Sequence, residues 1–219
     1  FDINGGTLSG DRANLFHSFQ RLGLNADQIA NFMTNPNIRN ILGRVVGGDP
    51  SRIDGLVRVT GGNSNLFLMN PAGIVFGSTA RLDVPGSFTA TTANGMKFGD
   101  RWFSATGDNQ YAALNGNPSA FAFTANQPGA IVNAGDLAVS QGKSLNLVGG
   151  KVINTGKLTA PGGTITIAAV PGQSQVQIRQ DGVLLALQVQ PPTGSGPNGL
   201  PFRPATLPEL LTGGENHRA

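Results

Sequence analysis

A repeat in the second half of this 219-residue chain limits the folds that the sequence can adopt. Residues 131–137 (IVNAGDL) recur at an offset of 21 as residues 152–158 (VINTGKL), with asparagine, glycine and leucine at matching places. A short alternating strand follows each copy, at 144–148 and at 164–168. A period near 20 residues, made of short strands and Asn/Gly turns, predicts a β-solenoid.

The repeat also predicts which residues stack. Each coil of a solenoid offers few apolar side chains, so it buries them only against the next coil, about 4.8 Å away. Asn133 should therefore stack with Asn154 in a ladder of side-chain amides. Asp136 should likewise lie over Lys157, as an exposed pair that adds about 0.2–1 kcal/mol and mainly tests the register.

The rest of the sequence favours strands over helices. Charged residues make up only 12% of the chain and strong helix formers are scarce, while 39% apolar residues is too many for general disorder. Phe121 and Phe123, on alternate positions, indicate a strand pair outside the main stack. We therefore expect an all-β protein. Short runs bounded by Gly, Pro or Asn predict strands at 53–59, 65–69, 74–76, 81–84 and 87–91.

One segment near the N-terminus has a helical pattern. Asn25 can cap a helix and Gln28 follows three residues later. Three apolar residues would share one face of that helix: Ile29, Phe32 and Met33. Because the end of a solenoid exposes unpaired strand edges, we expect this helix to close the stack as part of a cap within residues 1–40.

The chain divides into a domain and a tail. We expect residues 1–190 to form one β-helix domain, and residues 191–219, which are rich in Pro and Gly, to be a tail or linker to a missing C-terminal part. The chain has no initiator methionine, no signal peptide and no apolar run near 18 residues. We therefore expect an excised fragment that is not embedded in a membrane.

Two turns of the same kind are the candidate functional site. Residues 35–38 read Asn-Pro-Asn-Ile, and residues 70–74 read Asn-Pro-Ala-Gly-Ile. Proline fixes φ, glycine permits the left-handed position and asparagine bonds its own backbone, so such turns hold shape and supply no catalytic group. They are either a recognised surface or corners that fix the geometry of a coil. The candidate recognition residues are Asn35, Pro36, Asn37, Ile38, Asn70, Pro71, Gly73 and Ile74.

The sequence lacks the patterns of an enzyme or a metal protein. His17 and Ser18 are adjacent and would face opposite sides of a strand, so they cannot form a dyad, and we expect His17 to pack beside Phe16 and Phe19. The aspartates are spread singly at positions that suit turns. Cysteines, histidine pairs and phosphate-binding loops are missing. We expect no catalytic activity, no cofactor and no metal.

The charge pattern does not favour a nucleic-acid partner. A net charge of +3 comes from scattered arginines, and no short window holds three basic residues. Trp102 and Tyr111 are the only Trp and Tyr, so the aromatic platforms used for single strands are lacking.

Several segments match a known family, and both turns are among them. The segments are residues 1–7, 14–19, 35–38, 40–48 and 90–93. They resemble the N-terminal secretion domain of filamentous-haemagglutinin-like exoproteins, which are exported by two-partner secretion (TPS). Two motifs typical of that family, Asn-Pro-Asn-Leu and Asn-Pro-Asn-Gly-Ile, fall on the two turns. Ile38 replaces leucine in the first motif, and Ala72 replaces asparagine in the second and removes a side-chain amide.

This resemblance implies a right-handed parallel β-helix with an N-terminal cap and a non-enzymatic role in targeting a large exoprotein for secretion. It implies, as the partner, a cognate outer-membrane β-barrel transporter with POTRA domains. A monomer would then fold at the cell surface after export. The lack of cysteine fits this route, because a disulfide formed in the periplasm would lock loops that must pass extended through a pore.

Two alternatives from other classes stay open. Parallel β-helices also carry carbohydrate-active and carbohydrate-binding proteins, which need a groove with carboxylates or exposed aromatic rings. Only Trp102 and Tyr111 are available as sugar platforms. The domain could also be an adhesive surface in its own right.

Overall fold

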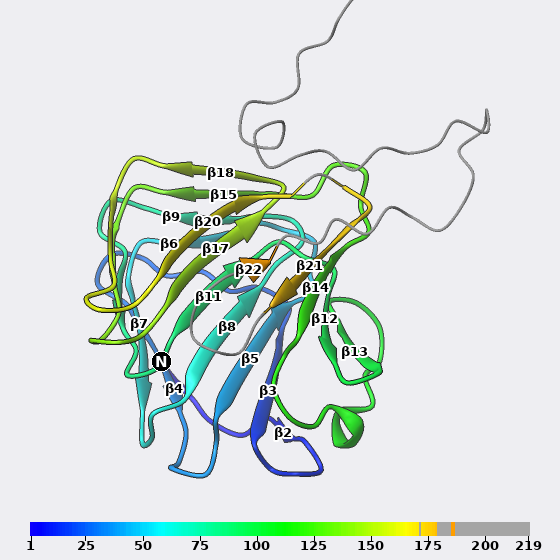
Figure 1. Ribbon diagram of the computed structural model, residues 1–219. Coiled ribbons are helices and arrows are strands. Elements are labelled where there is room, and N and C mark those ends of the chain that lie inside the picture. The colour runs from blue at the N-terminus through cyan, green and yellow to red at the C-terminus, as the bar shows by residue number, and fades with distance from the viewer. Residues whose placement is uncertain (171, 179–184, 187–219) are drawn as a thin grey trace, which may run out of the picture.

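The chain winds into a parallel β-helix with an additional antiparallel sheet at its side (Figure 1). The computed structural model describes residues 1–170, 172–178 and 185–186. The predicted tail at 191–219 lies outside the described residues, and the predicted domain boundary at 190 stays a prediction. The predicted all-β parallel β-helix is confirmed.

Three sheets, A, B and C, form the walls of the β-helix. Along the chain, successive strands of a coil belong to different sheets. Sheet A contains β1 (Asp2–Ile3), β4 (Ile29–Met33), β7 (Leu56–Thr60), β10 (Arg81–Asp83), β16 (Asp136–Ala138) and β19 (Lys157–Thr159). Sheet B contains β2 (Thr7–Leu8), β3 (Asn14–Phe19), β5 (Asn40–Val45), β8 (Asn65–Met69), β11 (Phe88–Thr91), β17 (Leu145–Gly149) and β20 (Ile165–Ala169). Sheet C contains β6 (Ser51–Ile53), β9 (Ile74–Phe76), β15 (Ala130–Asn133) and β18 (Lys151–Asn154).

The register of the coils agrees with the repeat in the sequence. β15 pairs in parallel with β18, and Asn133 lies opposite Asn154. β16 pairs with β19, and Asp136 lies opposite Lys157. Both predicted stacking pairs are therefore confirmed, and the repeat offset is the length of one coil.

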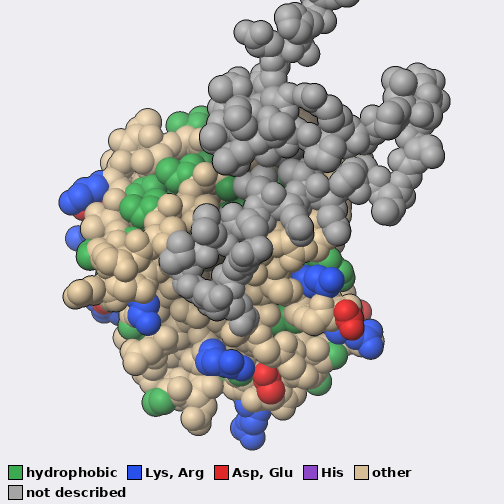
Figure 2. Space-filling model, in the orientation of Figure 1, with side chains coloured by type: hydrophobic (Ala, Val, Ile, Leu, Met, Phe, Trp, Pro, Cys, Tyr) green, Lys and Arg blue, Asp and Glu red, His purple; other side chains and the backbone are tan. Residues whose placement is uncertain are grey.

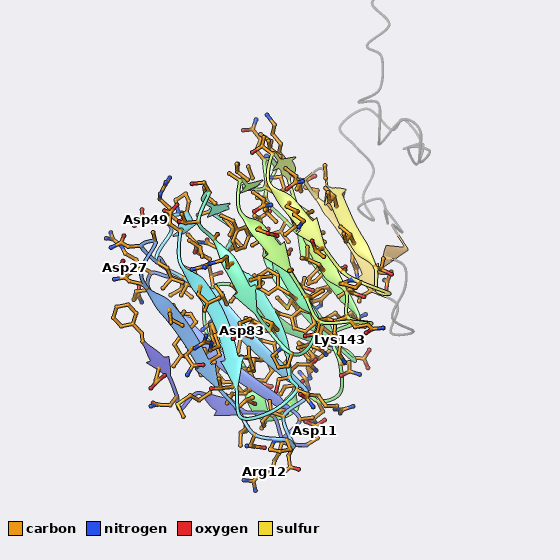
Figure 3. All side chains as sticks on the ribbon, turned by 90° about the vertical axis from the view of Figure 1, so that its left-hand side faces the viewer. Asp11, Arg12, Asp27, Asp49, Asp83 and Lys143 are labelled. Carbon is orange, nitrogen blue, oxygen red and sulfur yellow. The ribbon has the colours of Figure 1, made fainter. Side chains whose placement is uncertain are left out.

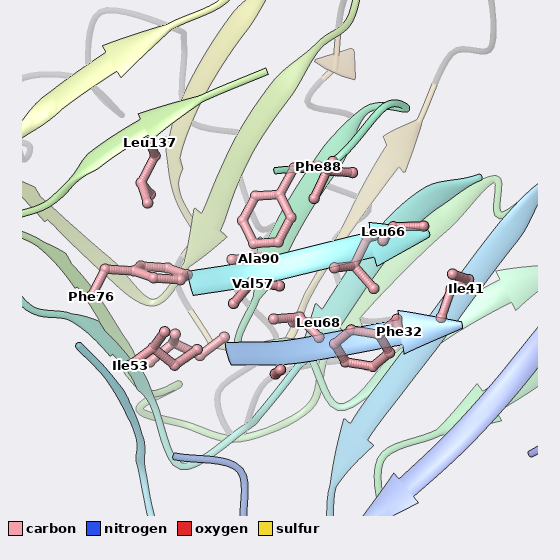
Figure 4. Close-up of a cluster of buried hydrophobic side chains, with 14 of the residues drawn as sticks. Phe32, Ile41, Ile53, Val57, Leu66, Leu68, Phe76, Phe88, Ala90 and Leu137 are labelled. Atoms are coloured by element: carbon pink, nitrogen blue, oxygen red, sulfur yellow. The ribbon is translucent and has the colours of Figure 1, made fainter. Parts of the chain in front are cut away.

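The main core lies inside the three walls and is built from columns of stacked apolar side chains (Figure 4). In sheet B, one column runs through Ile41, Leu66, Phe88 and Leu145, each of which is 0% exposed. Burying one such side chain fully contributes about 1.5–3 kcal/mol, so the stacking itself supplies much of the stability. The same column continues to Ile165 in β20, which is 42% exposed because no described strand lies beyond it.

A second core lies between the outer face of sheet B and the antiparallel outer sheet. The outer sheet contains β12 (Gly95–Phe98), β13 (Arg101–Ser104), β14 (Ala120–Phe123), β21 (Ser174–Ile178) and β22 (Leu185–Ala186). Phe16 and Leu42 point outward from sheet B into this core and pack with Phe98, Phe103 and Phe121. Sheet B is thus covered on both faces, which explains why every residue of β5 is buried. The strand predicted around Phe121 outside the stack is confirmed as β14.

The predicted N-terminal helix is wrong, because its segment forms a turn followed by a strand. The capping interactions do form: the Asn25 N–H bonds Gln28 Oε1 at 2.8 Å, and the Gln28 N–H bonds the Asn25 carbonyl at 3.0 Å. The chain then extends as β4 and pairs with β7, which buries Phe32 and leaves Met33 exposed. Strand pairing therefore overrides the local helical pattern. The cap is instead made of β1, which pairs with β4, and β2, which covers β3 in antiparallel fashion.

Candidate functional site

The turn at 35–38 joins β4 of sheet A to β5 of sheet B and presents three consecutive exposed residues. Asn35, Pro36 and Asn37 are exposed, whereas Ile38 is 4% exposed and packs in the main core. The Asn35 side-chain oxygen accepts a hydrogen bond from the Asn37 N–H at 2.9 Å, and the Asn35 carbonyl accepts one from the Ile38 N–H at 3.1 Å. The result is a rigid, polar turn at the surface, and the buried side chain of Ile38 anchors it to the main core.

The turn at 70–74 joins β8 of sheet B to β9 of sheet C, and its asparagine is buried. Asn70 is 1% exposed. Its side-chain oxygen accepts a hydrogen bond from the Ala72 N–H at 3.0 Å. Its side-chain amide donates to the Asp49 carbonyl and to Ser51 Oγ, both at 3.0 Å, in the preceding coil. Asn70 therefore fastens one coil to another.

The remaining residues of the second turn are also tied to neighbouring coils. Gly73 has a φ of +127°, and a Cβ there would lie 3.1 Å from the Ala130 carbonyl oxygen, so the turn requires glycine at this position. Ile74 is 1% exposed in the main core. Only Pro71 and Ala72 are half-buried and reach the surface. The bond to Asn70 uses the backbone of Ala72, so it does not need the asparagine that the family motif has there.

The two turns do not share a corner of the β-helix. The first lies between sheets A and B, and the second lies between sheets B and C. A partner that reads both must therefore contact two corners, at opposite ends of the strands of sheet B.

His17 and Ser18 point to opposite sides of β3, so they do not form a dyad. His17 is 7% exposed, with its ring 6.0 Å from that of Phe19 and 5.9 Å from that of Phe32. The contact with Phe19 was predicted, but Phe16 points instead into the second core. The Nε2 atom of His17 is buried and has no hydrogen-bond partner within the described structure. Burial lowers the pKa of His17 below its ordinary value.

The carboxylates do not gather into a site. Figure 3 shows Asp11, Asp49 and Asp83 on different parts of the fold. Asp49 pairs with Arg21 at 2.9 Å and Asp83 with Arg58 at 2.8 Å, both at the surface. Among the described residues, no group of three or more histidine, aspartate and glutamate side chains could hold a metal ion.

A buried asparagine ladder along sheet B was not predicted. The side-chain amide of Asn40 donates to the side-chain oxygen of Asn14 at 2.8 Å and of Asn117 at 3.0 Å, and Asn65 donates to Asn40 at 3.0 Å. Asn14 in turn donates to the carbonyls of Leu114 and Gly116, both at 2.9 Å. The ladder fixes the loop between β13 and β14 against the β-helix. Its signal in the sequence is an asparagine before two apolar residues at 14–16, 40–42 and 65–67.

Comparison with known proteins connects this chain to one family. A family model described as the TPS secretion domain matches residues 1–203. The chain belongs to the TPS secretion domain family. The crystal structure of the HMW1 secretion domain from Haemophilus influenzae is similar, with a TM-score of 0.55 and 24% sequence identity. The match covers 80% of this chain and 44% of that chain, and at this identity it shows the fold. No curated protein sequence is significantly similar.

A TPS secretion domain serves the secretion of the polypeptide that carries it, and membership implies a cognate outer-membrane transporter as its partner. Members of the family are exoproteins that cross the outer membrane. In the part of the chain that the structure describes, no helix is long and apolar enough to cross a membrane.

Proposed function

We propose that this TPS secretion domain addresses its polypeptide to a cognate outer-membrane β-barrel transporter with POTRA domains, and that the transporter reads the turn at 35–38. One observation carries this assignment. Asn35, Pro36 and Asn37 stand exposed in a turn whose shape is set by hydrogen bonds within the turn itself. A rigid, exposed group of donors and acceptors is suited to recognition, because little conformational entropy is lost on binding.

The locality of these bonds matters for a signal that is read before the β-helix forms. Among the described residues, Asn35 bonds only Asn37 and Ile38, two and three residues along the chain. Such an Asx turn does not depend on any other coil, so an extended chain in the periplasm can still present it. The resemblance to exported exoproteins supports recognition at that stage.

The second turn, at 70–74, mainly stabilises the shape of the β-helix and contributes less to direct contact with the transporter. The Asn70 amide bonds Asp49 and Ser51 of the preceding coil, so these two bonds exist only after the coils have stacked. Its outward atoms belong to Pro71 and Ala72. We assign Asn70, Gly73 and Ile74 to folding of the monomer at the cell surface, and Pro71 to the recognised surface.

Secretion of the domain from a Gram-negative host, with and without the transporter, tests the proposal. The domain is fused to a signal peptide and compared with Asn37→Ala, which removes an exposed amide but keeps the backbone N–H that bonds Asn35. Asn35→Asp keeps the acceptor oxygen of the turn and removes the NH₂ group. We expect both variants to lower transporter-dependent export while the melting temperature of the purified domain stays unchanged.

Asn63→Ala is the matched control, because Asn63 is exposed at the same corner one coil further along. It should be exported like the wild type. Export of Asn37→Ala and Asn35→Asp at the wild-type level would contradict recognition of this turn. Export that does not depend on the transporter would contradict the proposed function as a whole.

A further inference from the structure

An open hollow at the side of the outer sheet has no part in the proposed secretion signal. It has a volume of about 360 Å³ and lies between β13 and the loop that follows it. Among its lining residues are Asp100, Trp102, Asp108, Asn109 and Gln110. In Figure 1, β13 lies at the outer edge of the fold, and Figure 2 shows acidic and basic side chains together along that margin.

The fold presents the indole ring of Trp102 at the surface, where it offers a flat apolar face. Trp102 and Phe103 point to opposite sides of β13, so Phe103 is 0% exposed in the second core and Trp102 is 39% exposed. A Cβ on Gly95 would lie 3.3 Å from Cε3 of Trp102, so the indole rests across the backbone of that glycine on β12. Tyr111, the other candidate platform, packs against Phe16 and Phe103 instead. Trp102 is therefore the one sugar platform of the two.

The polar wall of the hollow is fixed by buried contacts. The Asn109 side chain accepts a hydrogen bond from the Ser104 N–H at 2.8 Å and donates one to the Ser104 carbonyl at 3.1 Å. Arg44, which is 8% exposed, donates from Nη1 to the carbonyls of Ser104 and Gly107, both at 2.8 Å. The loop is thus held in place before any ligand arrives, which reduces the entropy lost on binding.

Two carboxylates in the lining are free to bind a ligand. Within the described part of the chain, Asp100 and Asp108 make no hydrogen bond or ion pair. Ionised carboxylates accept hydrogen bonds strongly, so the hollow favours a ligand rich in hydroxyl donors, and the exposed Arg101 in the same lining adds further hydrogen-bond donors. The Gln110 side chain adds both a donor and an acceptor.

We propose that this hollow binds one pyranose ring of a saccharide. The apolar C–H face of the sugar lies on the indole of Trp102, and its hydroxyl groups donate to Asp100 and Asp108. Aromatic side chains with a few convergent polar groups are the usual composition of small-ligand sites. A peptide that pairs as an extra strand with the free edge of β13 fits less well. Asn109 already bonds the N–H and C=O of Ser104 at that edge.

The test uses the purified domain, in which Trp102 is the only tryptophan. A glycan array carrying bacterial and mammalian saccharides identifies the sugar, and the methyl glycoside of the best-bound sugar is then titrated. We expect a saturable shift in the fluorescence of Trp102 and in the NMR signal of its indole N–H. Trp102→Ala on the same array, and Asp108→Asn in the titration, should each weaken binding by about tenfold or more.

Phe1→Ala is the matched control, because Phe1 is an exposed ring (72%) outside the hollow. It should bind like the wild type. Lack of binding to any glycan on the array, or wild-type binding by both Trp102→Ala and Asp108→Asn, would overturn the proposal. Transporter-dependent export of Trp102→Ala should be unchanged, so the sugar site and the secretion signal are tested separately.

Discussion

The side-chain amide of Asn133 donates a hydrogen bond to the side-chain oxygen of Asn154 in the next coil, across 2.7 Å. Asn133 is 0% exposed and also bonds the N–H and the carbonyl of Gly135. Asn133→Ala removes all three bonds and leaves the Gly135 N–H buried without a partner among the described residues, whereas the Gly135 carbonyl keeps its bond from the Lys157 N–H at 2.9 Å. We expect it to lower the free energy of unfolding, measured with urea, by about 1–3 kcal/mol. Asn154→Ala, at an exposed position, should lower it by less than about 1 kcal/mol, and equal losses would contradict the role of burial.

His17 should make stability depend on pH. Burial lowers its pKa in the folded state, whereas the unfolded chain takes up a proton near pH 6.5. The unfolded state therefore binds more protons below that pH. Stability is fully present above about pH 6.5 and decreases as the pH falls through this value. Urea midpoints at pH 8 and pH 5 measure the effect, and His17→Leu should remove most of it.

His217→Gln provides the control, because His217 is the other histidine of the chain. It should keep the pH dependence of the wild type. Asp11 adds little in this window: burial would raise its pKa, but hydrogen bonds from Ser9 and two backbone N–H groups, with the nearby Arg39, hold that pKa below its usual range. An unchanged pH dependence in His17→Leu would show that another group is responsible.

The asparagine ladder should tolerate no charge at Asn40. Its amide donates to the side-chain oxygens of Asn14 and Asn117, and Asn40 is 1% exposed. Asn40→Asp would place a buried carboxylate against two acceptors. We expect a loss of about 3 kcal/mol or more, and faster hydrogen exchange in residues 114–117. Asn63→Asp, at an exposed position, should be nearly neutral, and a similar loss there would point to a general charge effect.

Two residues of one column should differ in their contribution to stability. Leu147 and Ile167 are paired in register on β17 and β20, yet Leu147 is 0% exposed and Ile167 is 49% exposed. Figure 2 shows hydrophobic side chains at the end of the β-helix where Figure 1 draws β18 and β20. Leu147→Ala should lower stability by about 2–5 kcal/mol and Ile167→Ala by less than about 1 kcal/mol, both measured with urea. Similar losses would mean that Ile167 is covered in solution.

The part of the fold that repeats could be predicted from the sequence. Stacked coils need the same residue type at the same place, so Asn133 and Asn154, or Asp136 and Lys157, disclose the register directly. The outer sheet has no such signal, because β12 and β13 are neighbours in the chain, as are β21 and β22, but β14 pairs with β12 and β21 from more distant segments. Phe121 pairs with Val176, for instance, and nothing near either residue indicates the other.

The N-terminal segment and the candidate site show the limits of local patterns. Asn25 and Gln28 do make the capping contacts, but the pairing of β4 with β7 decides the structure after them. The two Asn-Pro turns were recognisable by their residues. The sequence did not show that Asn35 is exposed and Asn70 is buried, because the burial of Asn70 depends on Asp49 and Ser51 in another coil.

The segment from β12 to β14, which builds most of the outer sheet, also affects the order in which the coils can assemble. Early coils join residues such as Asn40 and Asn65, 25 apart, whereas Thr89 and Asn146 on β11 and β17 are 57 apart. Closing the longer loop costs only about 0.7 kcal/mol more, but distant pairing slows folding. A chain that emerges N-terminus first can add its early coils one by one. The next pairing in sheet B, of β11 with β17, cannot form until β17 has also emerged. We therefore expect the β-helix to grow in two stages with a pause between them.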